Sequence, residues 1–94
     1  MQVKSSRRMQ ASLSGTMQFI GSWSFNEDES LCLVPRPYSG DVLAISTDNL
    51  RTRYKAALGG QPLEATTLDD HRVIARDWKT GHLLKGSFRR TWFS

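Results

Sequence analysis

The chain has 94 residues, of which 38% are hydrophobic and 23% charged, a composition that fits one small globular domain and excludes separate catalytic and regulatory domains. Thirteen Lys and Arg residues against nine Asp and Glu residues give a formal net charge of +4, which raises the question of a nucleic-acid partner. Cys32 is the single cysteine, so an internal disulfide and a cysteine-rich zinc site are excluded.

The positive charge is unevenly distributed along the chain. Residues 1–16 contain three basic residues and no acidic one, and Met17 directly precedes the first apolar run. We therefore expect residues 1–16 to form a flexible basic leader or tail, and residues 17–94 to form a single domain. Within that domain, residues 17–71 carry four basic and eight acidic groups, whereas residues 72–94 carry six basic groups and Asp77. The sequence thus predicts a charge dipole rather than a uniformly basic domain.

The sequence has neither a secretory signal nor a membrane span. Its first residues lack the apolar core of a signal peptide, and no run approaches the roughly 20 apolar residues that a spanning helix needs. We expect a cytoplasmic protein with no membrane association.

The first half of the domain predicts an antiparallel meander of three short strands. An aromatic run at 17–23 is followed by an acidic turn at 26–30. Residues 31–34 are continuously apolar and predict a buried strand, which Pro35 and Pro37 are expected to end. After a turn at 38–41, residues 42–45 predict the third strand.

Two helices are predicted next. Ser46 fits an N-cap, and Gly59-Gly60 fits a helix stop. Between them one apolar face is formed at helical spacing by Leu50, Tyr54, Ala57 and Leu58.

The second helix is predicted to begin at Thr66 or Thr67, each of which is followed three residues later by an aspartate, as in a capping box. Gly81 is the expected stop. The apolar stripe of this helix consists of Leu68, His71, Ile74, Ala75 and Trp78.

Residues 87–93 predict a closing strand, with Phe88, Arg90 and Trp92 on one face. The expected fold class is therefore α+β: a small single domain with an antiparallel sheet of three to four strands and two helices packed on one face, in the order β-β-β-α-α-β.

This order of elements resembles a family of small bacterial proteins, the domain-of-unknown-function family numbered 1488. The resemblance covers about residues 17–94, and it implies a small α+β fold with no assigned activity and therefore no functional residues. The chain departs from the family pattern in residues 1–16, in Gly59-Gly60 and in its aromatic, di-arginine end. The residues that carry the resemblance are Trp23, Glu27 to Glu29, Leu31 to Val34, Gly40, Val42 to Leu50, His71-Arg72 and Gly86 to Phe88.

No catalytic, metal or cofactor site is predicted. Cys32 lies between two leucines with no basic neighbour, which favours a buried structural thiol over a nucleophile. His71 on the apolar stripe favours a partly buried core histidine over a general base, although a small hydrolase built on His71 and an acid stays a third possibility. Asp69 and Asp70 are interpreted as helix-capping residues. The sequence contains no phosphate-binding glycine loop and no histidine pair at metal-ligand spacing.

The candidate binding surface lies at the basic end of the chain. Basic residues alternating with aromatic ones on a strand suit either a charged protein partner or nucleic acid. We predict a non-enzymatic protein-interaction or regulatory module that binds a protein partner or a second copy of itself, with nucleic-acid binding by the C-terminal strand as the alternative. The predicted surface consists of Arg72, Arg76, Lys79, Lys85, Arg89, Arg90 and Trp92.

Overall fold

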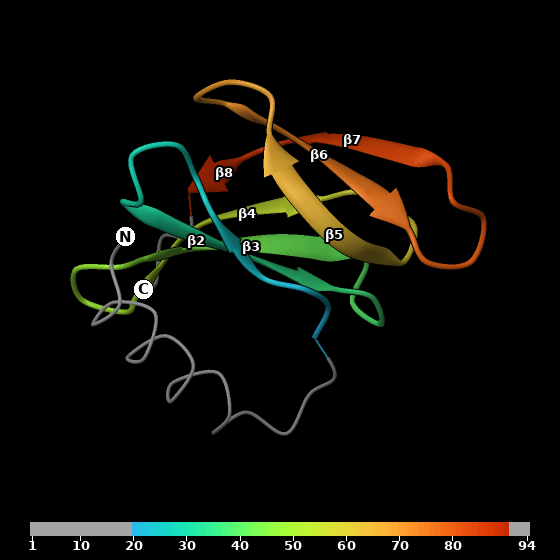
Figure 1. Cartoon of the computed structure of the whole chain (residues 1–94), viewed down its shortest axis with the longest axis horizontal. Coiled ribbons are helices and arrows are strands. Elements are labelled where there is room, and N and C mark those ends of the chain that lie inside the picture. The colour runs from blue at the N-terminus through green and yellow to red at the C-terminus, as the bar shows by residue number, and fades with distance from the viewer. Residues whose placement is uncertain (1–19, 91–94) are drawn as a thin grey trace.

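The computed structural model describes residues 20–90, and the regular structure in this range is entirely β (Figure 1). Two antiparallel sheets lie as two layers, one in the order β1-β2-β3-β4-β8 and the other in the order β5-β6-β7. The predicted α+β fold is therefore wrong, and so is the order β-β-β-α-α-β, because neither expected helix forms. The strands are β1 (Ser24–Phe25), β2 (Leu31–Arg36), β3 (Asp41–Ser46), β4 (Thr52–Ala57), β5 (Pro62–Thr67), β6 (Arg72–Asp77), β7 (Leu83–Ser87) and β8 (Arg89–Arg90).

The segment predicted as the first helix forms the turn between β3 and β4, and then β4 itself. The backbone N–H of Ser46 donates to the carbonyl of Arg51 across this turn, and Leu50 adopts a φ of 61°, which a right-handed helix does not contain. Along β4, Tyr54 and Ala56 pack into the core, while Arg53, Lys55 and Ala57, which alternate with them, are exposed. Of the predicted helical stripe, Tyr54 and Leu58 pack toward this core, whereas Ala57 is exposed and Leu50 packs against the cluster on the other face of the sheet. Pairing with β3 decides for the strand.

The segment predicted as the second helix forms the end of β5, the β5–β6 turn, β6 and the turn before β7. The carboxylate of Asp69 accepts hydrogen bonds from the backbone N–H groups of His71 and Arg72, at 2.8 and 2.9 Å, so it closes a turn rather than capping a helix. Val73 and Ala75 are buried at alternate positions of β6. His71 lies exposed in the turn, and its predicted place in the core is wrong.

The predicted meander is confirmed for β2 and β3, which pair from Leu31↔Ser46 to Arg36↔Asp41. Pro35 does not end β2 but lies buried inside it. Its carbonyl accepts the N–H of Gly21, so the polar edge of Pro35 faces the N-terminal segment and its missing N–H removes no hydrogen bond from the β3 ladder.

The two terminal strands are shorter than predicted. In the expected first strand, Ser22 forms one isolated bridge, and β1 begins only at Ser24; residues 17–19 lie outside the described residues. The expected closing strand at 87–93 is divided at Phe88 between β7 and β8, and residues 91–93 lie outside the description. The predicted leader at 1–16 also lies outside it.

The core forms on both faces of the five-stranded sheet. Between the layers, buried residues of β2, β3 and β4 meet Val73 and Ala75 of β6. On the opposite face, a second cluster around Cys32, Val34 and Ile45 is covered in part by Trp23 and Phe25, whose rings meet edge to face at 5.8 Å. Full burial of a Val or Leu side chain contributes roughly 1.5–3 kcal/mol. The buried residues of the first cluster are Leu33, Val42, Ala44, Ala56, Val73 and Ala75.

Both sides of the layered structure are joined by the chain. On one side, Ser22 forms a parallel bridge with Glu64 of β5, and the Ser24 hydroxyl donates to the carbonyl of Ala65 at 3.0 Å. On the other side, β7 leads through Phe88 into β8 and lies against β4. Gly86 makes this contact close, since a Cβ there would meet the side chain of Leu58. The seam between β4, β7 and β8 is one of the two sides at which the sheets come together.

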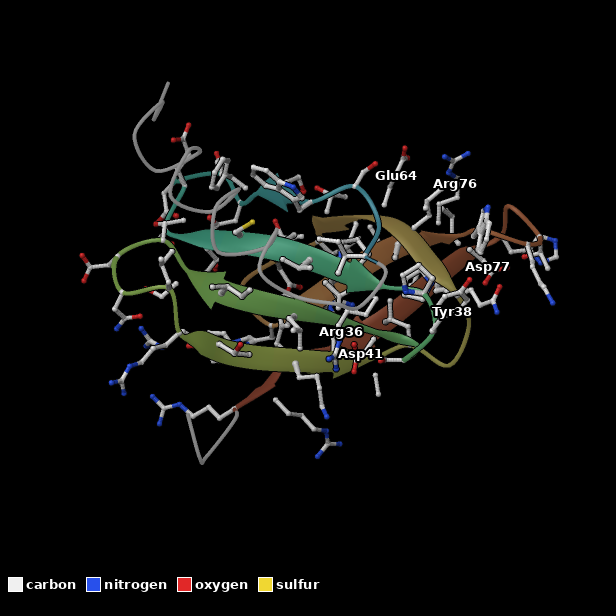
Figure 2. The ribbon with its side chains drawn as sticks, turned by 90° about the horizontal axis from the view of Figure 1, so that it is seen from below. Arg36, Tyr38, Asp41, Glu64, Arg76 and Asp77 are labelled. Atoms are coloured by element: carbon white, nitrogen blue, oxygen red, sulfur yellow. The ribbon has the colours of Figure 1, made fainter. Side chains whose placement is uncertain are left out.

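Polar groups tie together the loops at one end of the molecule. Arg36 and Asp41 point toward each other in Figure 2 and form two hydrogen bonds of 2.7 Å, a bidentate pair that also raises the pKa of the Arg36 guanidinium. The buried carboxylate of Asp77 accepts the backbone N–H of Gln61 at 2.7 Å, and the N–H and hydroxyl of Thr80 at 2.8 Å. The contacts of Asp77 connect the β4–β5 and β6–β7 loops.

Candidate anion-binding surface

The structure divides the predicted basic surface into separate parts. Arg72 and Arg76 lie on β6, and each is held by a neighbouring acid. The Arg72 guanidinium is 2.7 Å from the carboxylate of Asp69, and that of Arg76 is 3.2 Å from Glu64, beside it in Figure 2. The hydrogen bond from the Arg72 guanidinium is also the main cause of the lowered pKa of Asp69. Positive charge on β6 is therefore largely neutralised within the protein.

The other predicted residues are also distributed over different elements. Lys79 is exposed in the β6–β7 turn, and Lys85 is exposed in the middle of β7, opposite Ile74. Trp92 lies outside the described residues. Arg72, Arg76 and Lys85 share the outer face of the β5–β6–β7 sheet, since Lys85 is opposite Ile74, whereas Arg89 and Arg90 lie on β8 of the other sheet.

A different group of basic residues meets along β4 and β8. Arg89 is the register partner of Lys55, so both side chains leave the same face of the sheet. Arg53 precedes Lys55 by two residues on β4 and shares its face, while Arg90, the register partner of Tyr54, leaves the opposite face at the edge of the sheet. We call the four residues Arg53, Lys55, Arg89 and Arg90 the β4–β8 basic surface. All four are exposed.

The basic surface borders a hollow at the seam between the two sheets. This seam hollow has a volume of about 510 Å³ and is lined by Lys55, Ala57, Ser87, Arg89 and Arg90. Three of these side chains are cationic, one carries a hydroxyl, and none is acidic. The hollow lies within the volume range of roughly 300–1,000 Å³ that is usual for small-ligand sites.

The β4–β8 basic surface is not neutralised by the described part of the chain. Within residues 20–90, the ion pairs are those of Arg36 with Asp41, Arg72 with Asp69 and Arg76 with Glu64, and none involves the basic surface. Figure 2 shows nitrogen-tipped side chains projecting from this edge of the five-stranded sheet into solvent. Clustered cations of this kind create a local positive potential that attracts anions.

Acidic residues gather at a cleft that Tyr54 and Phe88 also line, so these acids lie next to β4 and β8. The cleft, of about 590 Å³, is rimmed by Glu27 and Asp28 from the β1–β2 loop and by Asp69 and Asp70 from the β5–β6 loop. The charge dipole predicted along the sequence stays a prediction, and Arg53 and Lys55 of β4 are basic residues that lie in the acidic half of the sequence.

The thiol and the two histidines of the described residues lie in different environments. Cys32 is fully buried, as expected, and desolvation raises the pKa of its thiol to about 12, so the reactive thiolate is strongly disfavoured. His71 and His82 are both exposed, in the β5–β6 turn and just before β7. Between residues 20 and 90, no group of three or more His, Cys, Asp or Glu side chains is placed to hold a metal ion. Nor does this range contain a helix that could cross a membrane.

The comparisons with known proteins do not assign this arrangement. No family model matches the chain, and neither the curated proteins nor the solved structures provide a match. The resemblance to family 1488 stays a prediction, and the α+β fold that it implied is wrong for the described residues.

Sequence reasoning missed the contribution of β4 to the basic surface. Arg53 and Lys55 alternate with Thr52, Tyr54 and Ala56, a two-residue period that indicates one basic and one core-facing side of a strand. Because the segment was assigned to a helix, its basic residues were placed away from the C-terminal strand.

Proposed function

We propose that this protein is a non-enzymatic interaction module that binds an anionic partner through the β4–β8 basic surface. One observation carries the proposal. Arg72 and Arg76 are neutralised by acids of the same chain, whereas Lys55 and Arg89 share one face beside a hollow whose lining within residues 20–90 includes no acid. The unneutralised cations are therefore the groups most ready to meet charge from outside.

The chemistry of the remaining side chains supports binding rather than catalysis. The one thiol has a raised pKa and no access to solvent, and neither histidine is buried beside an orienting carboxylate. Strands β4 and β8 hold the basic residues on a sheet, where their spacing is fixed by the backbone hydrogen bonds of the ladder.

Nucleic acid is the second candidate partner. Arg53 and Lys55 leave one face of β4 two residues apart, close to Arg89, and such a row of cations suits a chain of phosphates. This alternative shares the basic surface with the first proposal but requires an extended contact along β4.

The test is retention on immobilised heparin, a sulfated polyanion, followed by elution with a salt gradient. The variant Lys55→Gln/Arg89→Gln removes two charges from the basic surface, and Lys79→Gln/Lys85→Gln removes two from positions outside it. We expect the first variant to elute at clearly lower salt than the wild type and the second to elute close to the wild type, since local charge governs a local contact. Equal shifts for both variants would mean that only net charge matters, and the proposed surface would then be rejected.

A further inference from the structure

The seam hollow concentrates more positive charge than a single carboxylate can balance. Lys55 and Arg89 leave the same face of the sheet and contribute two formal positive charges to the hollow, Arg90 borders it from the opposite face of β8, and Ser87 adds a hydroxyl that donates or accepts a hydrogen bond. The strands fix this arrangement, because Lys55 and Arg89 are opposite each other in the β4–β8 ladder.

Two like charges directly opposite in an antiparallel pair destabilise the sheet. Lys55 and Arg89 form such a pair, and no acid of residues 20–90 lies within ion-pair distance of either. An anion between them would replace the repulsion by attraction. Binding and folding are then linked, so an anion that occupies the hollow stabilises the folded protein.

The charge of the hollow selects among anions. A glutamate side chain and an internal nucleic-acid phosphate each carry one negative charge, whereas a phosphorylated serine or threonine carries about −1.5 to −2 at neutral pH and presents three acceptor oxygens. Guanidinium groups such as those of Arg89 and Arg90 match phosphate oxygens with two parallel hydrogen bonds. The doubly charged group therefore fits the facing cations of Lys55 and Arg89 best.

We propose that the seam hollow is a binding site for a phosphoserine or phosphothreonine side chain of a partner protein. The inference rests on the proposed function, and it adds the chemical group that the basic surface recognises. The pairing favours this group over a nucleic-acid backbone, because successive phosphates of a backbone call for cations strung along a line, whereas Lys55 and Arg89 lie opposite each other at one point of the ladder beside the hollow.

The experiment titrates short peptides into the ¹⁵N-labelled full-length protein and follows the amide signals of Lys55, Ser87 and Arg89 by NMR. The probes are Gly-Gly-phosphoserine-Gly-Gly and the same peptide with glutamate at the centre, both blocked at their ends. We expect saturable shifts of the three signals and an affinity for the phosphopeptide about tenfold higher than for the glutamate peptide. Equal affinities, or no shifts at these residues, would overturn the inference.

Variants separate loss of the site from loss of the fold. Lys55→Gln/Arg89→Gln is expected to lose at least about tenfold in phosphopeptide affinity, with an unfolding midpoint at low salt that is unchanged or higher, because the like-charge pair is gone. The matched variant Lys79→Gln/Lys85→Gln should bind as the wild type does. If the two variants lose affinity equally, the hollow is not the binding site.

A third probe tests the competing partner. An oligothymidylate with a free 5′-hydroxyl group carries internal phosphates only, and we expect it to bind more weakly per site than the phosphopeptide. Tighter binding of this probe, with the same dependence on Lys55 and Arg89, would overturn phosphoprotein recognition in favour of nucleic acid. Retention on heparin without any preference for the phosphopeptide would overturn the inference and leave the anion-binding function standing.

Discussion

At the scale of single residues, Asp77 is a polar side chain that links two loops. Its carboxylate sits at the end of β6 and accepts three hydrogen bonds from two different loops, from Gln61 and from the backbone and hydroxyl of Thr80. The hydrogen bond from Gln61 is the largest cause of its lowered pKa, followed by those from Thr80. A group whose pKa is lower in the folded than in the unfolded state stabilises the fold above its unfolded pKa and loses that effect as the pH falls through the folded value.

We therefore expect Asp77→Asn to unfold at a lower temperature than the wild type near pH 7, because the amide keeps one acceptor oxygen and turns an N–H₂ group toward the N–H donors. The difference should narrow as the pH falls below the ordinary aspartate pKa of about 3.9 and through the lowered pKa of the folded state, where the wild-type carboxylate becomes protonated. Thermal unfolding followed by circular dichroism from about pH 7 to pH 2 measures this. Asp70→Asn, at an exposed position in the β5–β6 loop, is the control. A pH-independent difference between Asp77→Asn and the wild type would contradict the assigned role of the charge.

At the scale of elements, the sequence was read correctly where one pattern excluded the others. Residues 31–34 and 42–45 are too short for helices and are bounded by turn residues. The first segment is part of β2 and the second is part of β3. Cys32 was placed correctly in the core for the same reason.

The two predicted helices failed because their signals have a second meaning in hairpins. Ser46 and Asp69 satisfy N–H groups of turns as readily as those of a helix N-terminus: the Ser46 hydroxyl accepts the N–H of Asp48, and the Asp69 carboxylate accepts those of His71 and Arg72. Glycines at hairpin turns resemble helix stops as well. The pairing of distant strands decides between the two structures, and a local pattern does not contain it.

The strand assignment of β4 makes a direct prediction about alternate substitutions. Tyr54 packs into the core and lies against Phe88, with ring centroids 6.1 Å apart, whereas Arg53 and Lys55 point to solvent. Tyr54→Ala should cost roughly 2–3 kcal/mol, since its ring is half-buried rather than fully enclosed. Arg53→Ala and Lys55→Ala should each change stability by less than about 0.5 kcal/mol. Urea unfolding of the three variants measures the alternation, and similar losses at all three positions would contradict it.

The sequence predicts only part of the β4–β8 basic surface. Arg89 and Arg90 were predicted correctly to lie exposed on a strand, and they are part of the basic surface. Their neighbours across the ladder are Tyr54 and Lys55 of β4, a segment for which the sequence predicts a helix. Arg72 and Arg76 were included because they are basic, but the acids that neutralise them become neighbours only through the β5–β6 hairpin.

At the scale of the whole molecule, the two layers depend on closure at both sides. The seam that carries the hollow is one side, and the bridge between Ser22 and Glu64 is the other. At that bridge Gly21 donates its N–H to the carbonyl of Pro35 at 2.8 Å, and a Cβ on Gly21 would collide with the backbone carbonyl of Leu63. Only glycine allows the N-terminal segment to lie this close to β5.

We expect Gly21→Ala to destabilise the protein by roughly 1–3 kcal/mol, the usual range when extra atoms are forced into a packed contact. A backbone atom is in the way, so the two sheets must separate locally rather than a side chain turn aside. Ser22→Ala, an exposed change beside it that keeps the backbone hydrogen bond from Ser22 to Leu63, should cost less than about 0.5 kcal/mol. Chemical unfolding measures both. Heparin retention of folded Gly21→Ala should equal that of the wild type, because the basic surface lies at the opposite seam; equal stability of the two variants would show that this side of the structure does not require the close contact.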